Sequence, residues 1–468
     1  MMTQKSALSF DRVVWLSVAT VIVTIALVIL RGDQLQLLPQ RLSPVADAVG
    51  VSPRTQIVLQ FDQPLAALPP GATLQLTPPV TGALQIAADR LIFTPGMPLT
   101  TDMTYTVQLD AALRGQQGGR LREPLRWQFR TGGLQVVYTA VDAEGRERLF
   151  VADANLGGAA ERPASPTQLT SGPLSLWDFS VSPRSGQIVY SALKEDGTSD
   201  LWAVQLGDLT PTLLAPCPNA VCNSTAWSPD GKLLAYARRN ASEFGAAALS
   251  PPRLWLFDPA SGDTAPVFTD SQKLAFEPSW SADNQWLSYV SPEDGGVGVI
   301  QLATGQEQFY PTISGETGRW QPQADRLLYT SFRQVGEQYV AHIVLADPVS
   351  GEATNLSGET ALVEDGAPAW SPDGAWIAFR RKELTGPGAT PGKQIWRMRA
   401  DGRAAAPLTS DPGFDYSAPQ WSPDGRYLLF HRLPLKGPTI TLSVWIYDVT
   451  TGARWLVAEP GQRPQWAP

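Results

Sequence analysis

The chain has 468 residues, a length that favours two or three domains, or one domain joined to an array of repeats. Apolar residues make up 43% and charged residues only 17%, which excludes a largely disordered chain and allows real cores. The net charge of −8 argues against nucleic acid as a partner, because phosphate binding needs a basic surface.

The N-terminus contains an apolar run. Residues 13–30, VVWLSVATVIVTIALVIL, carry no charge, and as a helix at ~1.5 Å per residue they would span roughly 27 Å of the ~30 Å hydrocarbon core. A cleaved signal peptide is the alternative, but RGDQLQLLPQ follows without a small-residue cleavage site. We predict a single-pass transmembrane anchor, with residues 1–12 in the cytoplasm and the bulk of the chain outside it, in the periplasm or at the cell surface.

After a predicted linker at residues 31–43, residues 44–132 form a predicted β-domain. QIVLQF, RLIF, YTVQL and RWQF alternate apolar and polar residues, with Pro and Gly in the gaps. About seven short strands in ~90 residues indicate an immunoglobulin-like (Ig-like) sandwich. The segments SPRTQIVLQFDQPL and LIFTPGMPL also resemble bacterial Ig-like domains related to the SbsA family, and the resemblance implies a spacer or stalk.

Residues 134–468 repeat one pattern. WSPDG occurs three times, VSPRSG at 181–186 is a degenerate copy, and 40–53 residues separate successive sites. Strand-like runs follow each site, so four short strands recur about every 48 residues, as in the blades of a β-propeller. We predict seven blades, with six or eight as alternatives. The sites are headed by Trp227, Trp280, Trp320, Trp370, Trp421 and Trp466.

The repeated pentapeptide predicts a structural corner. Pro fixes φ, the Asp side chain can accept hydrogen bonds from nearby backbone N–H groups, and Gly accepts positive φ. The Trp would fill the wedge between neighbouring blades. Asp230, Asp373 and Asp424 could instead act as acids or metal ligands, but corners on different blades lie too far apart to act together.

The two ends of the repeat region predict how the ring closes. RPQWAP at 463–468 is a single innermost strand, and LQVVYTAV at 134–141 starts a unit that lacks one. Joining them completes one blade and removes exposed sheet edges. The segment IWRMRADG…WSPDGRYLLF (395–430) resembles the TolB-type, WD40-like propeller repeat, and the resemblance extends over about 335 residues. TolB itself is six-bladed and periplasmic, so its role in envelope assembly is not carried over.

Two sets of side chains are candidate functional groups. Cys217 and Cys222 stand five apart in CPNAVC and are predicted to form a disulfide, because a metal site would need further ligands. Basic residues begin the long loops on one face of the predicted propeller, where they could bind an anionic ligand or an acidic partner segment. The alternative is that each arginine supports its local turn. These arginines are Arg238, Arg239, Arg333, Arg380, Arg381 and Arg432.

The sequence also limits the class of function. His342 and His431 stand alone and are expected to be surface or packing residues, so we expect no metal and no cofactor. Propeller hydrolases of the prolyl oligopeptidase type carry an α/β-hydrolase domain with G-x-S-x-G, which is not found in this sequence. The sequence predicts a non-enzymatic scaffold that binds a protein, peptide or glycan. A propeller hydrolase or lyase, and a purely structural envelope component, are the alternatives.

Overall fold

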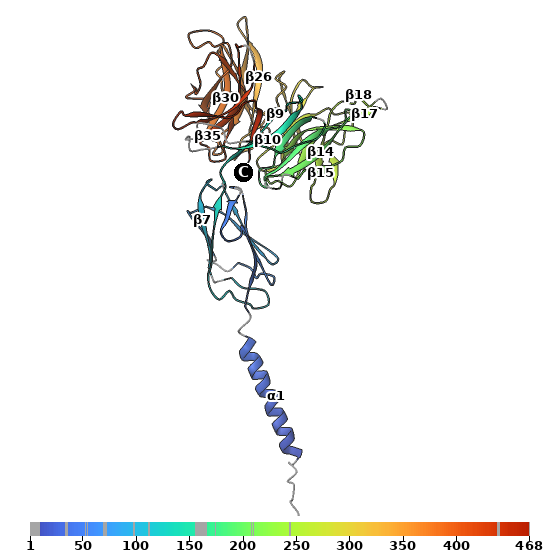
Figure 1. The fold of residues 1–468 in the computed structure, drawn as a ribbon, viewed down its shortest axis with the longest axis vertical. Helices are drawn as coiled ribbons and strands as arrows, with labels where there is room; N and C mark the ends of the chain where they lie inside the picture. The colour runs from blue at the N-terminus through green and yellow to red at the C-terminus, as the bar shows by residue number, and fades with distance from the viewer. Residues whose placement is uncertain are drawn as a thin grey trace, which may run out of the picture. The chain divides into compact units, whose positions relative to one another are not determined.

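The computed structural model describes residues 10–467 except 33–35, 52, 54, 69–72, 97–98, 111–112, 155–165, 174, 207, 209, 243–244 and 438–439. Apart from one N-terminal helix the described chain is all-β, and it divides into two compact units, 1–132 and 133–468. The first unit contains an Ig-like sandwich and the second a propeller-type domain (Figure 1).

The structure corrects the prediction of a transmembrane anchor. Helix α1 runs Phe10–Gly32, and its side chains are described for residues 14–26. Among the described residues, no helix is long and apolar enough to cross a membrane. The prediction of a single-pass membrane protein, with residues 1–12 in the cytoplasm and the remainder outside it, is therefore wrong; residues 1–9 lie outside the described residues.

The sandwich of the first unit has two four-stranded sheets around an apolar core. Ile57, Leu59 and Phe61 alternate with less buried neighbours along one strand, as the sequence pattern predicts. The indole of Trp127 donates to the Pro44 carbonyl at 3.1 Å and anchors the other sheet. One sheet has the order β1 (Pro39–Ser43), β3 (Ile57–Phe61), β6 (Arg90–Pro95), β5 (Gly82–Ala87), and the other β2 (Ala48–Val51), β8 (Leu125–Thr131), β7 (Thr104–Leu109), β4 (Leu74–Thr77).

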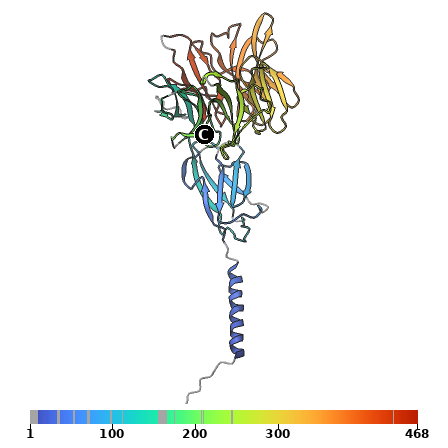
Figure 2. The same cartoon turned by 90° about the vertical axis from the view of Figure 1, so that its right-hand side faces the viewer.

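The second unit consists of sheets that follow one another around a ring, and their strands pair antiparallel except for one parallel pair between β27 (Gln338–Ala346) and β29 (Val363–Trp370). In Figure 2 their colours run from green to red, so sheets consecutive in sequence are neighbours in space. The first two sheets contain β9 (Gln135–Val141), β10 (Glu147–Asp153), β11 (Thr167–Gln168) and β38 (Gln462–Ala467), then β12 (Leu176–Val181), β13 (Gln187–Leu193), β14 (Ser199–Gln205) and β15 (Thr212–Ala215). The next two contain β16 (Ala220–Trp227), β17 (Leu234–Ser242), β18 (Gly245–Leu249), β19 (Arg253–Phe257) and β20 (Thr264–Pro266), then β21 (Phe276–Trp280), β22 (Trp286–Ser291), β23 (Gly296–Gln301) and β24 (Glu307–Pro311).

The remaining strands form one eight-stranded path and a final sheet. The former contains β25 (Arg319–Trp320), β26 (Leu327–Val335), β27 (Gln338–Ala346), β28 (Ala353–Asn355), β29 (Val363–Trp370), β30 (Trp376–Glu383), β31 (Gln394–Arg399) and β32 (Ala406–Pro407). The final sheet contains β33 (Phe414–Tyr416), β34 (Gln420–Trp421), β35 (Tyr427–Pro434), β36 (Ser443–Asp448) and β37 (Arg454–Ala458).

The ring closes through its two ends. Strand β38 pairs antiparallel with β9, with Trp466 opposite Val136 and Gln465 opposite Val137. The last strand thereby becomes the innermost strand of the first sheet, which confirms the closure predicted from the sequence. Closure covers an edge of β9 that would otherwise leave backbone N–H and C=O groups unpaired.

Each SPDG corner is stabilised by hydrogen bonds among its own side chains and backbone groups. Ser371 Oγ donates to Asp373 Oδ1 and accepts from the Trp376 N–H at 2.9 Å, while Asp373 Oδ1 accepts from the Ala375 N–H at 3.0 Å. Gly374 has φ of 68° and donates its N–H to the Ser371 carbonyl at 2.8 Å. The Ser–Asp bond recurs at Ser228–Asp230, Ser281–Asp283 and Ser422–Asp424. The corner aspartates therefore stabilise the turns in which they lie.

A disulfide joins Cys217 to Cys222 just before and within β16, with 6.3 Å between the Cα atoms. Both residues are buried, and the Cys222 carbonyl accepts hydrogen bonds from Ser191 and Ser199. The bridge fixes the loop that leads into an innermost strand.

The tryptophans connect neighbouring sheets through hydrogen bonds as well as packing. Each indole N–H donates to the carbonyl of the residue that immediately precedes the equivalent Trp of the preceding repeat. The pairs are Trp280 to Ala226 (3.0 Å), Trp320 to Ser279 (3.1 Å), Trp370 to Arg319 (3.2 Å), Trp421 to Ala369 (3.1 Å) and Trp466 to Gln420 (3.1 Å). We call these five bonds the indole ring. The sequence predicted the packing role but not the bonds.

The indole ring is interrupted at the degenerate repeat. The preceding repeat of Trp227 has Val181 in the Trp position, and the Trp227 indole nitrogen is buried without a hydrogen-bond partner among the described residues. On the other side of this repeat Gln465 replaces the indole. Its amide accepts from the Val181 N–H at 3.1 Å and donates to the Phe179 carbonyl at 3.0 Å.

The interruption provides a matched test of the indole ring. Trp370→Phe and Trp227→Phe remove similar apolar area, but only Trp370→Phe removes a hydrogen bond. We expect Trp370→Phe to lower the free energy of unfolding by about 1–2 kcal/mol more than Trp227→Phe. Thermal and denaturant unfolding measure the difference. Equal losses in the two variants would show that the indoles act through packing alone.

Candidate functional site

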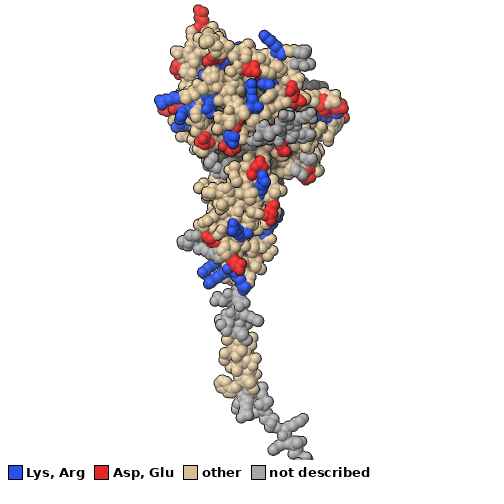
Figure 3. All heavy atoms as spheres, turned by 60° about the vertical axis from the view of Figure 1, so that its left-hand side comes forward, with Lys and Arg blue, Asp and Glu red and all other residues tan. Residues whose placement is uncertain are grey.

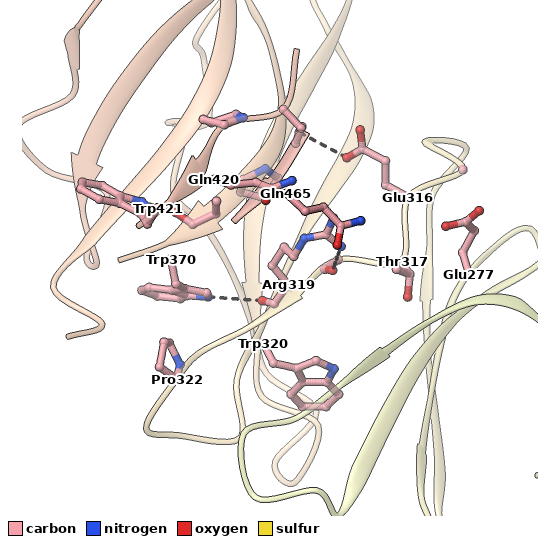
Figure 4. Close-up of a pocket in the computed structure, with 17 residues that line it drawn as sticks. Glu277, Glu316, Thr317, Arg319, Trp320, Pro322, Trp370, Gln420, Trp421 and Gln465 are labelled. Carbon is pink, nitrogen blue, oxygen red and sulfur yellow. Dashed lines mark hydrogen bonds between the residues drawn. The ribbon is translucent and has the colours of Figure 1, made fainter. Parts of the chain in front are cut away.

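A cavity lies at the centre of the ring. It has a volume of about 560 Å³ and is lined by the innermost strands, with the indoles of Trp320, Trp370 and Trp421 along one wall (Figure 4). Polar side chains face its middle and its other side, and these are Glu277, Glu316, Arg319, Gln420 and Gln465. We call it the channel cavity.

A second cavity of about 510 Å³ adjoins the channel cavity, because Glu277 lines both. Its charged lining residues are Asp178, Arg239, Glu277 and Arg463, and Trp177 and Phe276 contribute apolar surface. We call it the mouth cavity.

The sequence register explains which side chains reach the two cavities. Several innermost strands carry an irregularity a few residues before the Trp, and a bulge of this kind redirects the side chain at that point. The residue three positions before each Trp, or before Val181, lines one cavity or the other. These residues are Asp178, Ser224, Glu277, Thr317, Ala367, Ala418 and Arg463, and we call them the mouth ring. The position could have been found from the repeat spacing, but the sequence analysis did not use it.

Four mouth-ring residues have a left-handed backbone that non-glycine residues rarely adopt. Their φ values are 54° at Ser224, 53° at Glu277, 47° at Ala367 and 49° at Arg463. Such a conformation costs free energy and persists where the surrounding structure fixes it. The indole ring and the antiparallel pairing of each innermost strand with the next strand of its sheet provide that constraint here.

Asp178 is the most perturbed acid of the mouth ring. Its Oδ2 accepts the Ser224 N–H, while its Oδ1 is buried with no hydrogen-bond partner among the described residues. Burial raises the pKa of Asp178 to about 7; the Ser224 N–H opposes the rise, the charge of Glu277 adds to it, and Arg463 opposes it. The residue is partly exposed, but its carboxylate is poorly solvated.

The two cations of the mouth cavity have other partners. The guanidinium of Arg463 pairs with Glu147, and its Nη1 donates to the Trp177 carbonyl at 2.7 Å. Arg239 Nε donates to the Ser250 carbonyl at 3.0 Å. Neither has a direct ion pair with Asp178 or Glu277 within the described residues.

Basic groups gather on another side of the ring. The guanidinium of Arg380 donates to the Tyr416 carbonyl at 3.1 Å, and its Nε is buried with no partner among the described residues. Burial, followed by the charge of Arg380, lowers the pKa of Lys393. The same two causes lower the pKa of His431 to about 4, so His431 is neutral at neutral pH.

The structure does not bring the six predicted arginines together as one group. Arg239 lines the mouth cavity, and Arg380 lies among the basic groups just described. The other four have local partners: Arg238 donates to Pro218, Arg333 pairs with Glu359 at 2.8 Å, Arg381 pairs with buried Asp365 at 2.6 Å, and Arg432 lies between the rings of Phe414 and Trp445, 3.9 Å from each.

The histidine and metal candidates from the sequence give no separate site among the described residues. His342 is buried, with Nε2 2.8 Å from the Ala361 carbonyl and Nδ1 3.0 Å from the Asn355 amide. Within the described ranges, no group of three or more His, Cys, Asp or Glu side chains could hold a metal ion. On the face of the second unit seen in Figure 3, basic and acidic residues are intermingled, with no large patch of one sign.

Comparison with known proteins identifies both units. A family model described as the TolB beta propeller domain matches residues 250–468, and one described as a bacterial Ig-like domain matches residues 39–131. A Bacillus subtilis protein, "Uncharacterized peptidase YuxL", is 23% identical over 190 residues. That match covers 33% of this chain and 28% of the relative.

Two solved structures share the fold. A puromycin hydrolase mutant complexed with PGG is 15% identical, with a TM-score of 0.53 over 71% of this chain and 53% of that one. A Mycobacterium tuberculosis puromycin-hydrolyzing peptidase is 15% identical, with a TM-score of 0.50, and the match covers 70% of this chain and 54% of the peptidase chain. This chain therefore spans about half of the solved chains and less than a third of the curated relative.

These comparisons overturn the prediction of a non-enzymatic scaffold. The curated relative is named a peptidase, and the two solved structures are named a puromycin hydrolase and a puromycin-hydrolyzing peptidase. They favour the alternative that the sequence analysis placed second, a propeller hydrolase. The prediction that the protein is not an enzyme is corrected accordingly.

Asp178 makes stability depend on pH in a defined direction. Because its pKa is higher in the folded chain than in the unfolded one, its proton stabilises the fold fully below pH ~4, and this stabilisation is lost as the pH rises through 7. Asp178→Asn stays neutral throughout. We expect the variant to gain stability over the natural protein between pH 4 and pH 8, by up to about 4 kcal/mol at ~1.4 kcal/mol per pKa unit.

Melting temperatures measured from pH 4 to pH 8 test this expectation. Asp263→Asn, at an exposed aspartate between β19 and β20, is the matched control and should show no such trend. A constant difference between Asp178→Asn and the natural protein over this range would show that Asp178 titrates as an ordinary carboxyl.

Proposed function

Because this chain belongs to the TolB-type propeller proteins and carries a bacterial Ig-like domain, we propose that it supplies the propeller of a peptide-hydrolysing enzyme. The peptidase names of the curated relative and of one solved structure support the reaction class. In this proposal the propeller receives the peptide. The bond-breaking groups belong to the part of the enzyme that corresponds to the unmatched portion of those longer chains.

The observation that carries the proposal is the lining of the channel cavity. Its walls are innermost strands, and the sheet orders place β12, β16, β21, β25 and β34 at sheet edges. Edge strands offer backbone N–H and C=O groups to an extended chain, and peptides commonly bind by this kind of strand addition. Side chains of both charges, Glu316 and Arg319 among them, suit the charged and polar groups of a peptide.

We further infer that the propeller has seven blades. The eight-stranded path divides naturally into two four-stranded units, because β27 and β29 are joined by one parallel pair, Ala341 with Glu364. The remaining five sheets of the ring count as one blade each. Nucleic acid is not expected as a partner, given the net charge of −8.

Narrowing the channel tests whether the substrate enters it. Ala418 is an exposed mouth-ring residue that lines the channel cavity, so Ala418→Trp adds a large ring there. Ala303→Trp adds the same ring at an exposed turn after β23. The enzyme is isolated from its source cells through a tag on this chain, and hydrolysis of fluorogenic tripeptide amides is measured.

We expect Ala418→Trp to lower kcat/KM by about tenfold or more, while Ala303→Trp stays within about twofold of the natural protein. Tripeptide hydrolysis that is unaffected by Ala418→Trp would remove the channel from the reaction. Absence of peptide hydrolysis and of peptide binding in the isolated enzyme would contradict the proposed function as a whole.

A further inference from the structure

A third cavity lies between the first and second sheets of the second unit. It has a volume of about 500 Å³ and shares no lining residue with the channel cavity or the mouth cavity. One wall is formed by β13 and β14, and the other by β10 and the connection from β11 to β12. Its apolar lining includes Pro173, Leu176, Tyr190, Ala192, Trp202 and Pro211. We call it the side groove.

Two aromatic side chains reach the side groove from neighbouring strands. Tyr190 of β13 is directly opposite Trp202 of β14, so their side chains lie on the same face of the sheet. Within the described part of the chain, neither the Tyr190 hydroxyl nor the Trp202 indole nitrogen has a hydrogen-bond partner, and neither atom is fully buried. Burial of the ring raises the pKa of Tyr190 to about 12, so the hydroxyl keeps its proton at neutral pH. The side groove therefore offers two unused hydrogen-bond donors that a ligand can reach.

The acceptors in the lining of the side groove already serve the protein itself. Asp200 Oδ1 accepts from Lys194 Nζ at 3.2 Å and from the Cys217 N–H at 2.7 Å. The Gly172 carbonyl accepts from Arg148 Nη2 at 2.6 Å. Because its donors are unused while these acceptors are occupied, the side groove suits a ligand that brings acceptors and few donors.

A proline-rich segment has this combination of groups. Proline has no backbone N–H, and in the polyproline II conformation the carbonyls form no internal hydrogen bonds, so they can accept from a phenol or an indole. Proline-rich segments of this conformation dock into aromatic-lined grooves. An ordinary peptide would bring an N–H group at each residue, and a sugar would bring several hydroxyl donors, for which the side groove has few free acceptors. Its volume of about 500 Å³ is large enough for a short segment.

We propose that the side groove binds a proline-rich segment of a partner protein in the polyproline II conformation, with the Tyr190 hydroxyl and the Trp202 indole donating to its carbonyls. Pro173, Leu176 and Pro211 supply apolar contacts for the proline rings. The side groove is separate from the channel cavity, so this interaction goes beyond the proposed function and does not rest on it.

The probe is hexaproline that carries a fluorescent label at one end and is blocked at the other, and its binding to the full chain is measured by fluorescence anisotropy. A Gly-Ser hexapeptide with the same ends is the control peptide, because it is flexible and has an N–H group at each residue. We expect hexaproline to bind about tenfold or more tightly than the control peptide. Tyr190→Phe and Trp202→Phe each remove one donor and keep an aromatic ring, so each should weaken hexaproline binding by about three- to tenfold.

Two variants that leave the side groove unchanged are the controls. Tyr339→Phe removes an exposed phenol hydroxyl on β27, and Ala418→Trp narrows the channel cavity, so both should bind hexaproline as the natural protein does. Equal binding of the two peptides, or binding of neither, would overturn the proposal. Hexaproline binding that Tyr190→Phe and Trp202→Phe leave unchanged would also overturn it. So would loss of binding in Ala418→Trp, because the peptide would then occupy the channel cavity.

Discussion

The rest of the ring depends on one repeated hydrogen bond, from the indole of one innermost strand to the carbonyl before the indole of the previous one. Trp370 to Arg319 and Trp421 to Ala369 are two of the five examples. Each bond sets the spacing of two neighbouring sheets at the channel wall, where blades are closest. Packing of the same indoles fills the wedge. A polar bond and an apolar contact from one side chain therefore fix the same interface.

The positions of the side chains in the candidate site follow from these bonds between innermost strands. Where a hydrogen bond holds the Trp, the residue three positions earlier is held at the channel mouth, even if its backbone is left-handed, as at Glu277 and Ala367. The tryptophans and the SPDG corners repeat, whereas the mouth-ring residues differ from blade to blade and include two acids, an arginine, two hydroxyl residues and two alanines. Residue types can vary at these positions without disturbing the corners, because the aspartate side chains there accept the serine hydroxyls of their own turns. A rigid scaffold with variable positions at one rim is a common arrangement for binding sites.

Sequence reasoning reached the parts of the structure that repeat. The Trp spacing, the SPDG corners and the joining of β38 to β9 could be predicted because each depends on local residue chemistry. The contacts of Arg381 and Arg432 could not be predicted, because the sheets bring their partners, Asp365 and Trp445, close to them only in the folded chain. The unpaired oxygen of Asp178 likewise depends on packing between blades. The prediction of a membrane anchor was wrong, since no helix among the described residues is long and apolar enough to cross a membrane.

The central claim is that a peptide enters the channel cavity. The most direct measurement is a crystal structure of the full chain with trialanine bound. The account predicts electron density for the peptide inside the channel cavity, along the wall that contains Trp320 and Trp370. Peptide density at the SPDG corners or on the outer strands, with the channel cavity occupied only by water, would contradict the account.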